Sequence, residues 1–278
     1  RQRQMCIRDR YTLHEVSAPA GYCVAADQTI VVGTDGKLQS FSMTDLTTKV
    51  SLTKYEITGE KELAGASLEL YAAERDANGN YIRKGDAVEK WTSTDKAHEI
   101  IGVLTAGETY TLHEVSAPNG YVVAADASFT VNTDGSLNVV SMYDDTTKVS
   151  ISKTDITGEK NISGATLQII DKNGNVIHEW ISGTDVNYME AQLTAGETYT
   201  LHETNAPAGY VLAQDQQFTV NPDGSITKVN MQDDTTKVSI TKYDLTSGKE
   251  LPGATLQIID KNGNIVEEWI STGEAHLI

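Results

Sequence analysis

The sequence predicts an all-β chain of tandem β-sandwiches, and three features support this prediction. Short runs of alternating apolar and polar residues are typical of half-buried strands, and no period of 3.6 residues indicates helices instead. Asn-Gly and Asp-Gly pairs, such as Asn173-Gly174 and Asp223-Gly224, separate the runs as hairpin turns in which both central residues adopt positive φ. The chain also repeats, and roughly seven runs in each repeat fit a sandwich of two sheets.

The repeat period sets the expected domain boundaries. Glu15, Glu114 and Glu203 occupy equivalent places, so the repeat advances by 99 residues and then by 89. The ten extra residues form an inserted loop around 71–89. We expect a C-terminal half-repeat at 11–46, full repeats at 47–145 and 146–234, and an N-terminal half-repeat at 235–278. Residues 1–10 match no repeat and look like foreign sequence, so they are left out of the fold prediction.

The second full repeat shows the expected strands most clearly. Each is a short apolar run that alternates with polar residues and ends near a turn. In chain order they are 149–153, 165–170, 175–181, 199–203, 217–220 and 229–233. Only four residues, without Gly or Pro, separate Asp144 from Val149, so consecutive domains are expected to be joined closely and to form a stiff rod.

Composition excludes several classes of protein. The 278 residues carry a formal net charge of −17, which argues against nucleic-acid binding because such binding depends on a basic surface. No run of about 20 apolar residues is present, so we expect no membrane-spanning segment. Of the two cysteines, Cys23 takes the place of Val122 and Val211 in the other copies. We therefore expect it to pack as a small apolar residue and to form no disulfide.

One motif, Tyr-Thr-Leu-His-Glu-x-x-Ala-Pro-x-Gly-Tyr, occurs three times, at 11–22, 110–121 and 199–210. Its first half predicts a strand on which Tyr110, Leu112 and Glu114 share one face, because successive side chains point to opposite sides. A carboxylate is therefore expected on an apolar face. The second half predicts a type I turn, with Pro118 at the second position and Gly120 at the fourth.

The same alternation places a Lys and an Asp on apolar faces of the first and last strands of each full repeat. Lys54 shares its face with Val50 and Leu52, and Asp144 shares its face with Met142. Each full repeat therefore directs a Lys, a Glu and an Asp toward its core. The two sets are Lys54, Glu114 and Asp144 in the first full repeat, and Lys153, Glu203 and Asp233 in the second.

Burying three ionisable groups is unfavourable by several kcal/mol for each unpaired ion. Desolvation lowers the pKa of an amine and raises that of a carboxyl, and two facing carboxyls tend to keep a proton. A neutral Lys can then attack a neutral Asp, while the Glu polarises the Asp carbonyl and passes a proton to the departing water. The product is an uncharged Lys–Asp isopeptide bond, which is compatible with a core.

These residues carry a family resemblance. The pattern in the second full repeat is Lys153-x-Asp155, Gly164-Ala165-Thr166-Leu167, Trp180-Ile181-Ser182, Tyr199-x-Leu201-x-Glu203-Thr204-x-Ala206-Pro207-x-Gly209-Tyr210, Phe218-Thr219-Val220 and Met231-x-Asp233. It resembles the collagen-adhesin B-type (Cna B) domains, also called SpaA-like or prealbumin-like, of Gram-positive surface proteins and pilins. The resemblance implies tandem seven-stranded prealbumin/immunoglobulin-like β-sandwiches from residue 11 onward. It also implies a spontaneous bond from the first-strand Lys to the last-strand Asp, with the motif Glu114 or Glu203 as catalyst.

The half-repeats hold incomplete triads. The first has Glu15 and Asp45 but no first-strand Lys, and the last has the first-strand Lys242 but neither partner acid. Neither half can cross-link within itself. Because the halves are complementary, a further hypothesis is that they pair between molecules; a monodisperse monomer on sizing chromatography at high concentration would contradict it.

Other interpretations of these features stay open. The triads also fit a buried network of ion pairs, or strand-end side chains that reach solvent. The loop at 171–175 has some likeness to a calcium loop, but its Gly comes fourth instead of sixth, so we expect a hairpin. His14, His113 and His202 alternate with the Glu and are expected to face away from it. Without a nucleophile elbow, phosphate loop or metal cluster in the sequence, we expect no cofactor and no enzyme beyond single-turnover self-cross-linking.

The expected function is structural. The resemblance implies the stalk of a surface adhesin or pilin, located outside the cell at the cell wall of a Gram-positive bacterium, with neighbouring domains of the same protein as partners. The alternative is a binding module in which the inserted loop at 71–89, with Tyr71 and Tyr81, contacts a host matrix protein or glycan.

Overall fold

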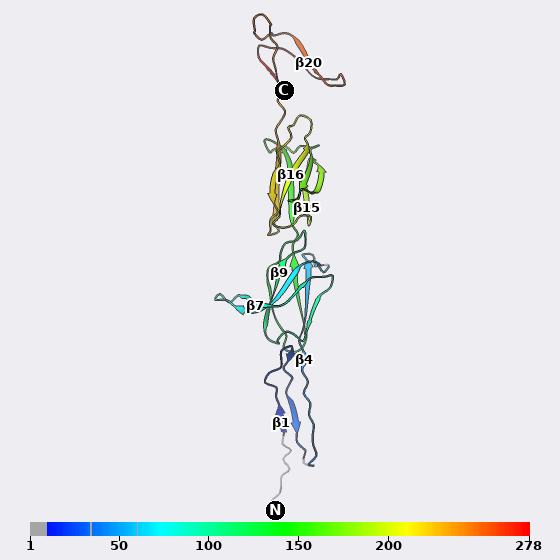
Figure 1. Ribbon diagram of the computed structural model, residues 1–278, viewed down its shortest axis with the longest axis vertical. Coiled ribbons are helices and arrows are strands. Elements are labelled where there is room, and N and C mark those ends of the chain that lie inside the picture. Colours follow the sequence, from blue (N-terminus) through cyan, green and yellow to red (C-terminus); the bar gives the residue numbers. More distant parts are fainter. Residues whose placement is uncertain (1–9, 34, 60) are drawn as a thin grey trace, which may run out of the picture. The chain divides into compact units, whose positions relative to one another are not determined.

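The computed structural model describes residues 10–33, 35–59 and 61–278 (Figure 1). The segment predicted to be foreign, 1–10, therefore lies outside the described residues except for Arg10. All regular elements in the described part of the chain are β-strands. The predicted all-β fold is confirmed.

The first sandwich contains seven of the described strands, in two sheets. One sheet has the order β10-β9-β6-β7 and the other β11-β5-β8. The strands are β5 (Lys49–Glu56), β6 (Ser67–Arg75), β7 (Tyr81–Thr92), β8 (His98–Ile101), β9 (Thr109–Ser116), β10 (Ala127–Thr130) and β11 (Leu137–Asp144). The first strand, β5, and the last, β11, are parallel neighbours, with Met142 opposite Lys54 and Asp144 opposite Glu56. The sandwich therefore begins and ends on adjacent strands.

The core of the first sandwich lies between these sheets. Leu52 from β5 and Ile100 from β8 belong to one buried cluster with Leu70 from β6 and Leu112 from β9. Every second side chain of each strand points inward, which is why the alternating sequence pattern forms two facing apolar layers. Each buried aliphatic side chain of this size contributes about 1.5–3 kcal/mol.

The second sandwich repeats this arrangement with seven described strands. Its sheets have the orders β14-β13-β16-β17 and β15-β12-β18. The strands are β12 (Lys148–Asp155), β13 (Thr166–Ile170), β14 (Val176–Ile181), β15 (Asn187–Glu190), β16 (Thr198–Asn205), β17 (Gln216–Thr219) and β18 (Ile226–Asp233). On β18 exposed and buried residues alternate along the whole strand, ending with the buried Asp233. Both predicted seven-stranded sandwiches are thus present.

The predicted hairpin turn at Asn173-Gly174 is wrong in type. Of the two residues only Gly174 has a positive φ, at 87°. The Gly174 N–H donates to the Asp171 carbonyl, and the Asp171 N–H donates to the Asn175 carbonyl. The hairpin therefore has a three-residue loop that ends in a left-handed glycine. The pair Asp223-Gly224 departs from the prediction in the same way, with positive φ at the glycine alone.

The predicted turn of the repeated motif is also wrong in type. The Tyr121 N–H donates to the Pro118 carbonyl, so Pro118 is the first turn position and Gly120 the third. Gly120 has a φ of 88°, which the third position of a type II turn requires and a type I turn does not. The glycine is needed for this left-handed backbone.

The inserted segment of the first sandwich is a hairpin and not the predicted loop. β6 continues to Arg75 and β7 begins at Tyr81, so the paired strands project from the sheet (Figure 1). The connecting turn at 76–80 has the same two backbone hydrogen bonds as the turn at 171–175. The insertion therefore lengthens both strands and keeps the turn. We call residues 72–84 the arm.

The flanking segments form short strand pairs. In the first, β1 (Arg10–Leu13) pairs with β3 (Gln28–Val31), and β2 (Tyr22–Cys23) pairs with β4 (Leu46–Thr47). In the last, β19 (Ser239–Ile240) pairs with β22 (His276–Leu277), and β20 (Thr255–Ile259) pairs with β21 (Ile265–Ile270). Cys23 is buried and free, as predicted. Residues 41–45 align with the last strand of each full repeat, on which Asp144 and Asp233 lie, but they form no strand. Among the described residues of this segment there is no first strand beside them.

Candidate functional site

The first sandwich brings the predicted residues Lys54, Glu114 and Asp144 together in its core. They come from β5, β9 and β11, and at most 2% of any of them is exposed. The Lys54 Nζ donates to Glu114 Oε2 at 3.0 Å and also contacts Asp144 Oδ1. These strand-end side chains therefore do not reach solvent.

The second sandwich forms the same cluster from Lys153, Glu203 and Asp233. At most 4% of any of the three is exposed. The Lys153 Nζ contacts Asp233 Oδ1 and lies 3.1 Å from Glu203 Oε1. These contacts fit a buried ion-pair network, and they also fit an amine placed to attack a carboxyl.

The two carboxyls of the first cluster share one environment. Burial is the main cause that raises the pKa of Asp144 to about 7; the Lys54 ammonium acts in the opposite direction, and the Glu114 carboxyl adds to the rise. Burial likewise raises the pKa of Asp233. Glu114 Oε1 and Asp144 Oδ2 have no hydrogen-bond partner among the described residues. A proton held between the two carboxyls would satisfy both oxygens.

A backbone N–H that sequence reasoning missed holds each motif glutamate. Glu114 Oε2 accepts the Ala124 N–H at 2.7 Å, and Glu203 Oε2 accepts the Ala213 N–H at 2.7 Å. The alanine follows the glutamate by ten residues in both domains. That constant spacing is the signal that could have revealed it. The bond fixes the carboxylate where it can meet both the amine and the aspartate.

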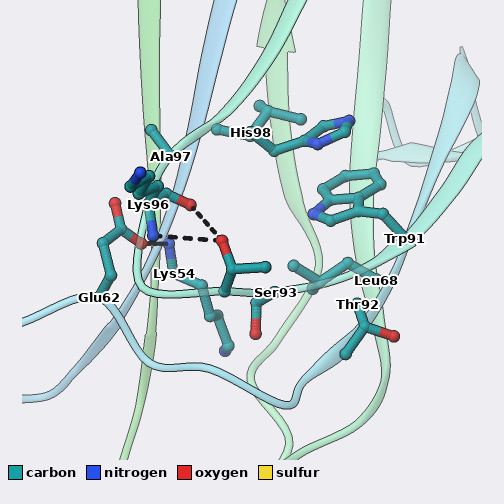
Figure 2. Close-up of a pocket in the computed structure, with 11 residues that line it drawn as sticks. Lys54, Glu62, Leu68, Trp91, Thr92, Ser93, Lys96, Ala97 and His98 are labelled. Carbon is teal, nitrogen blue, oxygen red and sulfur yellow. Dashed lines mark hydrogen bonds between the residues drawn. The ribbon is translucent and has the colours of Figure 1, made fainter.

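A small cavity of about 50 Å³ lies beside Lys54 (Figure 2). Glu62 Oε2 accepts the Lys54 backbone N–H at 2.9 Å, and the Lys54 side chain runs away from Glu62. Trp91 and His98 stack on the other side of the cavity, with ring centroids 4.3 Å apart. The lining is partly polar, so the cavity can hold water. Asn161 stands where Glu62 does in the second sandwich, so this contact is not common to both sites.

The incomplete triads of the flanking segments are differently placed. Glu15 accepts the Ala25 N–H at 2.6 Å, as in the full sandwiches. Limited desolvation and the neighbouring Glu15 raise the pKa of Asp45, so the two acids of this segment lie side by side. Lys242, in contrast, is exposed and lies outside β19. Cross-linking between the two flanking segments of different molecules stays a prediction.

A family model for the SpaA prealbumin-like fold domain matches residues 48–146 and 147–235. The chain belongs to this family. The family resemblance read from the sequence is thus confirmed, and the two sandwiches are the first and second SpaA domains. The half-repeats at 11–46 and 235–278 lie outside the matched ranges, except for residue 235, and stay predictions.

Several solved structures are similar to the chain. The Bacillus anthracis TIE protein is 23% identical, with a TM-score of 0.42 over 97% of this chain and 51% of its own. The shaft pilin SpaA from Lactobacillus rhamnosus GG is 18% identical, with a TM-score of 0.31 over 68% of this chain and 98% of its own. The Streptococcal ancillary pilin is 23% identical, with a TM-score of 0.32 over 81% of this chain and 75% of its own. The chain thus spans about half the length of the TIE protein. A search of curated proteins finds no match.

Each SpaA domain also carries a histidine–aspartate pair on its motif strand. His113 Nδ1 lies 2.7 Å from Asp126 Oδ1, and His202 Nδ1 lies 2.6 Å from Asp215 Oδ1. These pairs are at least partly exposed, unlike the buried triads. Within the described ranges no three potential metal ligands gather. In the same ranges no helix has the length and apolar character needed to cross a membrane.

Proposed function

We propose that the chain is part of the stalk of a cell-surface pilin or adhesin, in which each SpaA domain closes itself with an isopeptide bond. The bonds join Lys54 to Asp144 and Lys153 to Asp233. The observation that carries the proposal is the buried contact of each Lys amine with an Asp and a Glu. Tandem SpaA domains support a stalk at the cell wall of a Gram-positive bacterium, with neighbouring domains of the same protein as partners.

The proposed reaction converts one amine and one carboxyl into one amide and one water. The neutral Lys54 Nζ attacks Asp144 Cγ, a C–N bond forms, and the C–OH bond breaks. The raised pKa of Asp144 favours the protonated carboxyl that this step requires. Glu114, which contacts the amine, takes its proton and passes one to the departing hydroxyl. The partly polar cavity beside Lys54 offers a place for the released water.

The bond would stabilise each domain without any further contact. It links residues 90 apart in the first domain and 80 apart in the second. On the loop-entropy model, closing loops of this length stabilises the fold by about 4.6 kcal/mol. It also replaces buried charges with a neutral amide. Both effects suit a spacer that is under tension, and single-turnover chemistry is sufficient for them.

Intact mass spectrometry tests the proposal. The purified chain should weigh less than its calculated mass by two waters. Glu114→Ala and Glu203→Ala should each restore one water, because each removes one catalyst. A folded chain with the full calculated mass would overturn the bonds and leave the buried ion-pair network in their place.

A second candidate function is binding through the arm. The arm is an ordered hairpin whose tip carries Arg75 over the ring of Tyr81, with the Arg75 Cζ 4.2 Å from the ring centroid. Tyr81 and Ile82 are exposed. Deleting residues 74–83 tests this function: loss of adhesion to matrix proteins or glycans, with unfolding unchanged, would favour binding. Unchanged adhesion would leave the domain a spacer.

A further inference from the structure

A groove of about 520 Å³ crosses the surface of the second SpaA domain. It lies between the turn at 171–175 and the strands β16 and β17. Its main lining residues are Ile170, Asp171, Thr198, Thr200, Asp215 and Gln217. Lys172 also lines it, so its charged groups are two carboxylates and one ammonium.

The equivalent face of the first SpaA domain is covered by the arm. Arg83 Nε lies 3.4 Å from Asp126 Oδ2. The neighbouring Thr109 hydroxyl is the main cause of the lowered pKa of Tyr81, so the Tyr81 hydroxyl lies beside Thr109. An aromatic and an arginine side chain, two residues apart on β7, therefore lie on this face. The Tyr81 and Arg83 side chains thus indicate which groups this face can bind.

Asp215 of the second domain presents the same atoms as Asp126 of the first. Each aspartate binds its histidine through Oδ1, and Oδ2 is the oxygen that Arg83 meets on Asp126. The Asp215 side chain is 58% exposed. Thr198 likewise occupies the place of Thr109. The second domain therefore has the aspartate and threonine that, in the first domain, meet the arm.

The shorter hairpin of the second domain explains why no arm covers Asp215 and Thr198. In the first domain β6 extends to Arg75 before the turn, whereas β13 of the second domain ends at Ile170. The second hairpin is ten residues shorter and has no segment equivalent to Tyr81 and Arg83. The turn at 171–175 instead borders the open groove.

We propose that this groove binds an extended segment of another protein that carries an aromatic residue and, two residues later, an arginine. Alternation along a strand puts both side chains on one face of the segment. The arginine pairs with Asp215 Oδ2 as a charge-assisted hydrogen bond, and the ring packs over Thr198 and Ile170. This site lies outside the buried triad and does not depend on the isopeptide bond.

A peptide taken from the arm provides the probe. A fluorescein-labelled peptide of residues 78–85, Asn-Gly-Asn-Tyr-Ile-Arg-Lys-Gly, is titrated with the full chain by fluorescence polarisation. We expect saturable binding of one peptide per chain and no binding of the peptide with Glu in place of the arginine. Asp215→Asn should weaken binding about tenfold because it removes the charged acceptor. Asp185→Asn, an exposed change elsewhere in the same domain, should leave binding unchanged.

Two further variants test whether the peptide binds in the groove itself and whether the arm covers the equivalent face of the first domain. Gln217→Trp fills the groove from an exposed position and should abolish binding without disturbing the core. Deleting residues 74–83 should uncover the face of the first domain and raise the stoichiometry to two peptides per chain. Failure to saturate, or saturation that Asp215→Asn leaves unchanged, overturns the proposal. Dimerisation of the chain that disappears with the arm would also overturn it, because the occupant would then be a second copy.

Discussion

The first SpaA domain and the segment 10–46 contain the same motif, yet only the domain buries its aspartate. In both, the motif glutamate accepts an N–H from the alanine ten residues later, at 2.6 Å for Glu15 and 2.7 Å for Glu114. Asp144 is fully buried at the end of β11. Asp45 is only partly buried and belongs to no strand.

This difference shows that residues close in the sequence position the glutamate, whereas burial of the aspartate requires strands that are far apart in the sequence. The glutamate is oriented by its own strand and the loop that follows, so it is set even without a complete sandwich. The aspartate is buried only where the first strand lies beside the last, as β5 lies beside β11. That first strand also supplies the lysine. Bond formation should therefore depend on pairing of the terminal strands more than on the motif.

The largest expected effect comes from removing a lysine. Lys153→Ala should lower the free energy of unfolding of the second domain by about 4.6 kcal/mol, because the loop is no longer closed. Guanidinium unfolding, with intact mass to confirm one missing bond, measures this. The control is Lys160→Ala, an exposed lysine of the same domain, which should change neither quantity. Equal stability of Lys153→Ala and the parent would contradict the proposed role of the bond.

Removing the backbone donor should slow the reaction without removing a reacting group. Ala213→Pro deletes the N–H that holds Glu203, a hydrogen bond to a charged group worth about 1.5–3 kcal/mol, so bond formation should slow by about 10–100-fold. The time course of water loss during cell-free synthesis measures the rate. Ala213→Gly keeps the N–H and should react at nearly the parent rate. If the proline variant is as fast, local orientation of the glutamate is unimportant.

The rate should also depend on pH. The reacting carboxyl must be protonated, and the pKa of Asp144 is raised to about 7. The protonated fraction is nearly complete at pH 6 and falls about tenfold by pH 8, so bond formation in the first domain should slow by that factor as pH rises. Mass time courses at both values provide the measurement. A rate that increases over this range would show that deprotonation of the lysine is limiting instead.

The smallest effect is expected from a substitution in the segment 10–46. Glu15→Ala removes a motif glutamate whose own segment has no first-strand lysine. The two-water deficit and the unfolding transitions of both SpaA domains should be unchanged, as judged by mass and calorimetry. A deficit smaller by one water than that of the parent would mean that Glu15 takes part in bond formation.

Strand alternation predicted the triads because, once one residue of a regular strand is known to face the core, every second residue faces it too. It placed Asp144, and not its neighbour Asp145, on the face toward the core; the Asp145 side chain is 38% exposed and pairs with Lys148 at 2.7 Å. Alternation could not supply the parallel pairing of β5 and β11, since that contact joins residues far apart in the sequence. It also missed the Ala124 N–H, because alternation describes side chains and only the constant ten-residue spacing from the glutamate points to this backbone donor.

The same limits explain the wrong predictions. Phe41, Met43 and Asp45 alternate as the residues of a last strand do, but a strand needs a paired neighbour, and alternation does not show whether one is present. The insertion at 71–89 lacks clear alternation around Gly85, where the pairing of β6 and β7 is irregular, so it looked like a loop. Its strands form because a turn with the same backbone hydrogen bonds as the turn at 171–175 joins two longer strands.

The adjacency of the terminal strands has a mechanical consequence once the bond is formed. A pulling force that enters at Lys49 would cross from Lys54 to Asp144 and leave the domain, so the residues between them would carry no tension. Without the bond, unravelling that stretch would release roughly 300 Å of extended chain, at about 3.3–3.6 Å per residue. In a single-molecule pulling trace the bonded domain would thus behave as an inextensible link, although its sheets remain ordinary hydrogen-bonded structures.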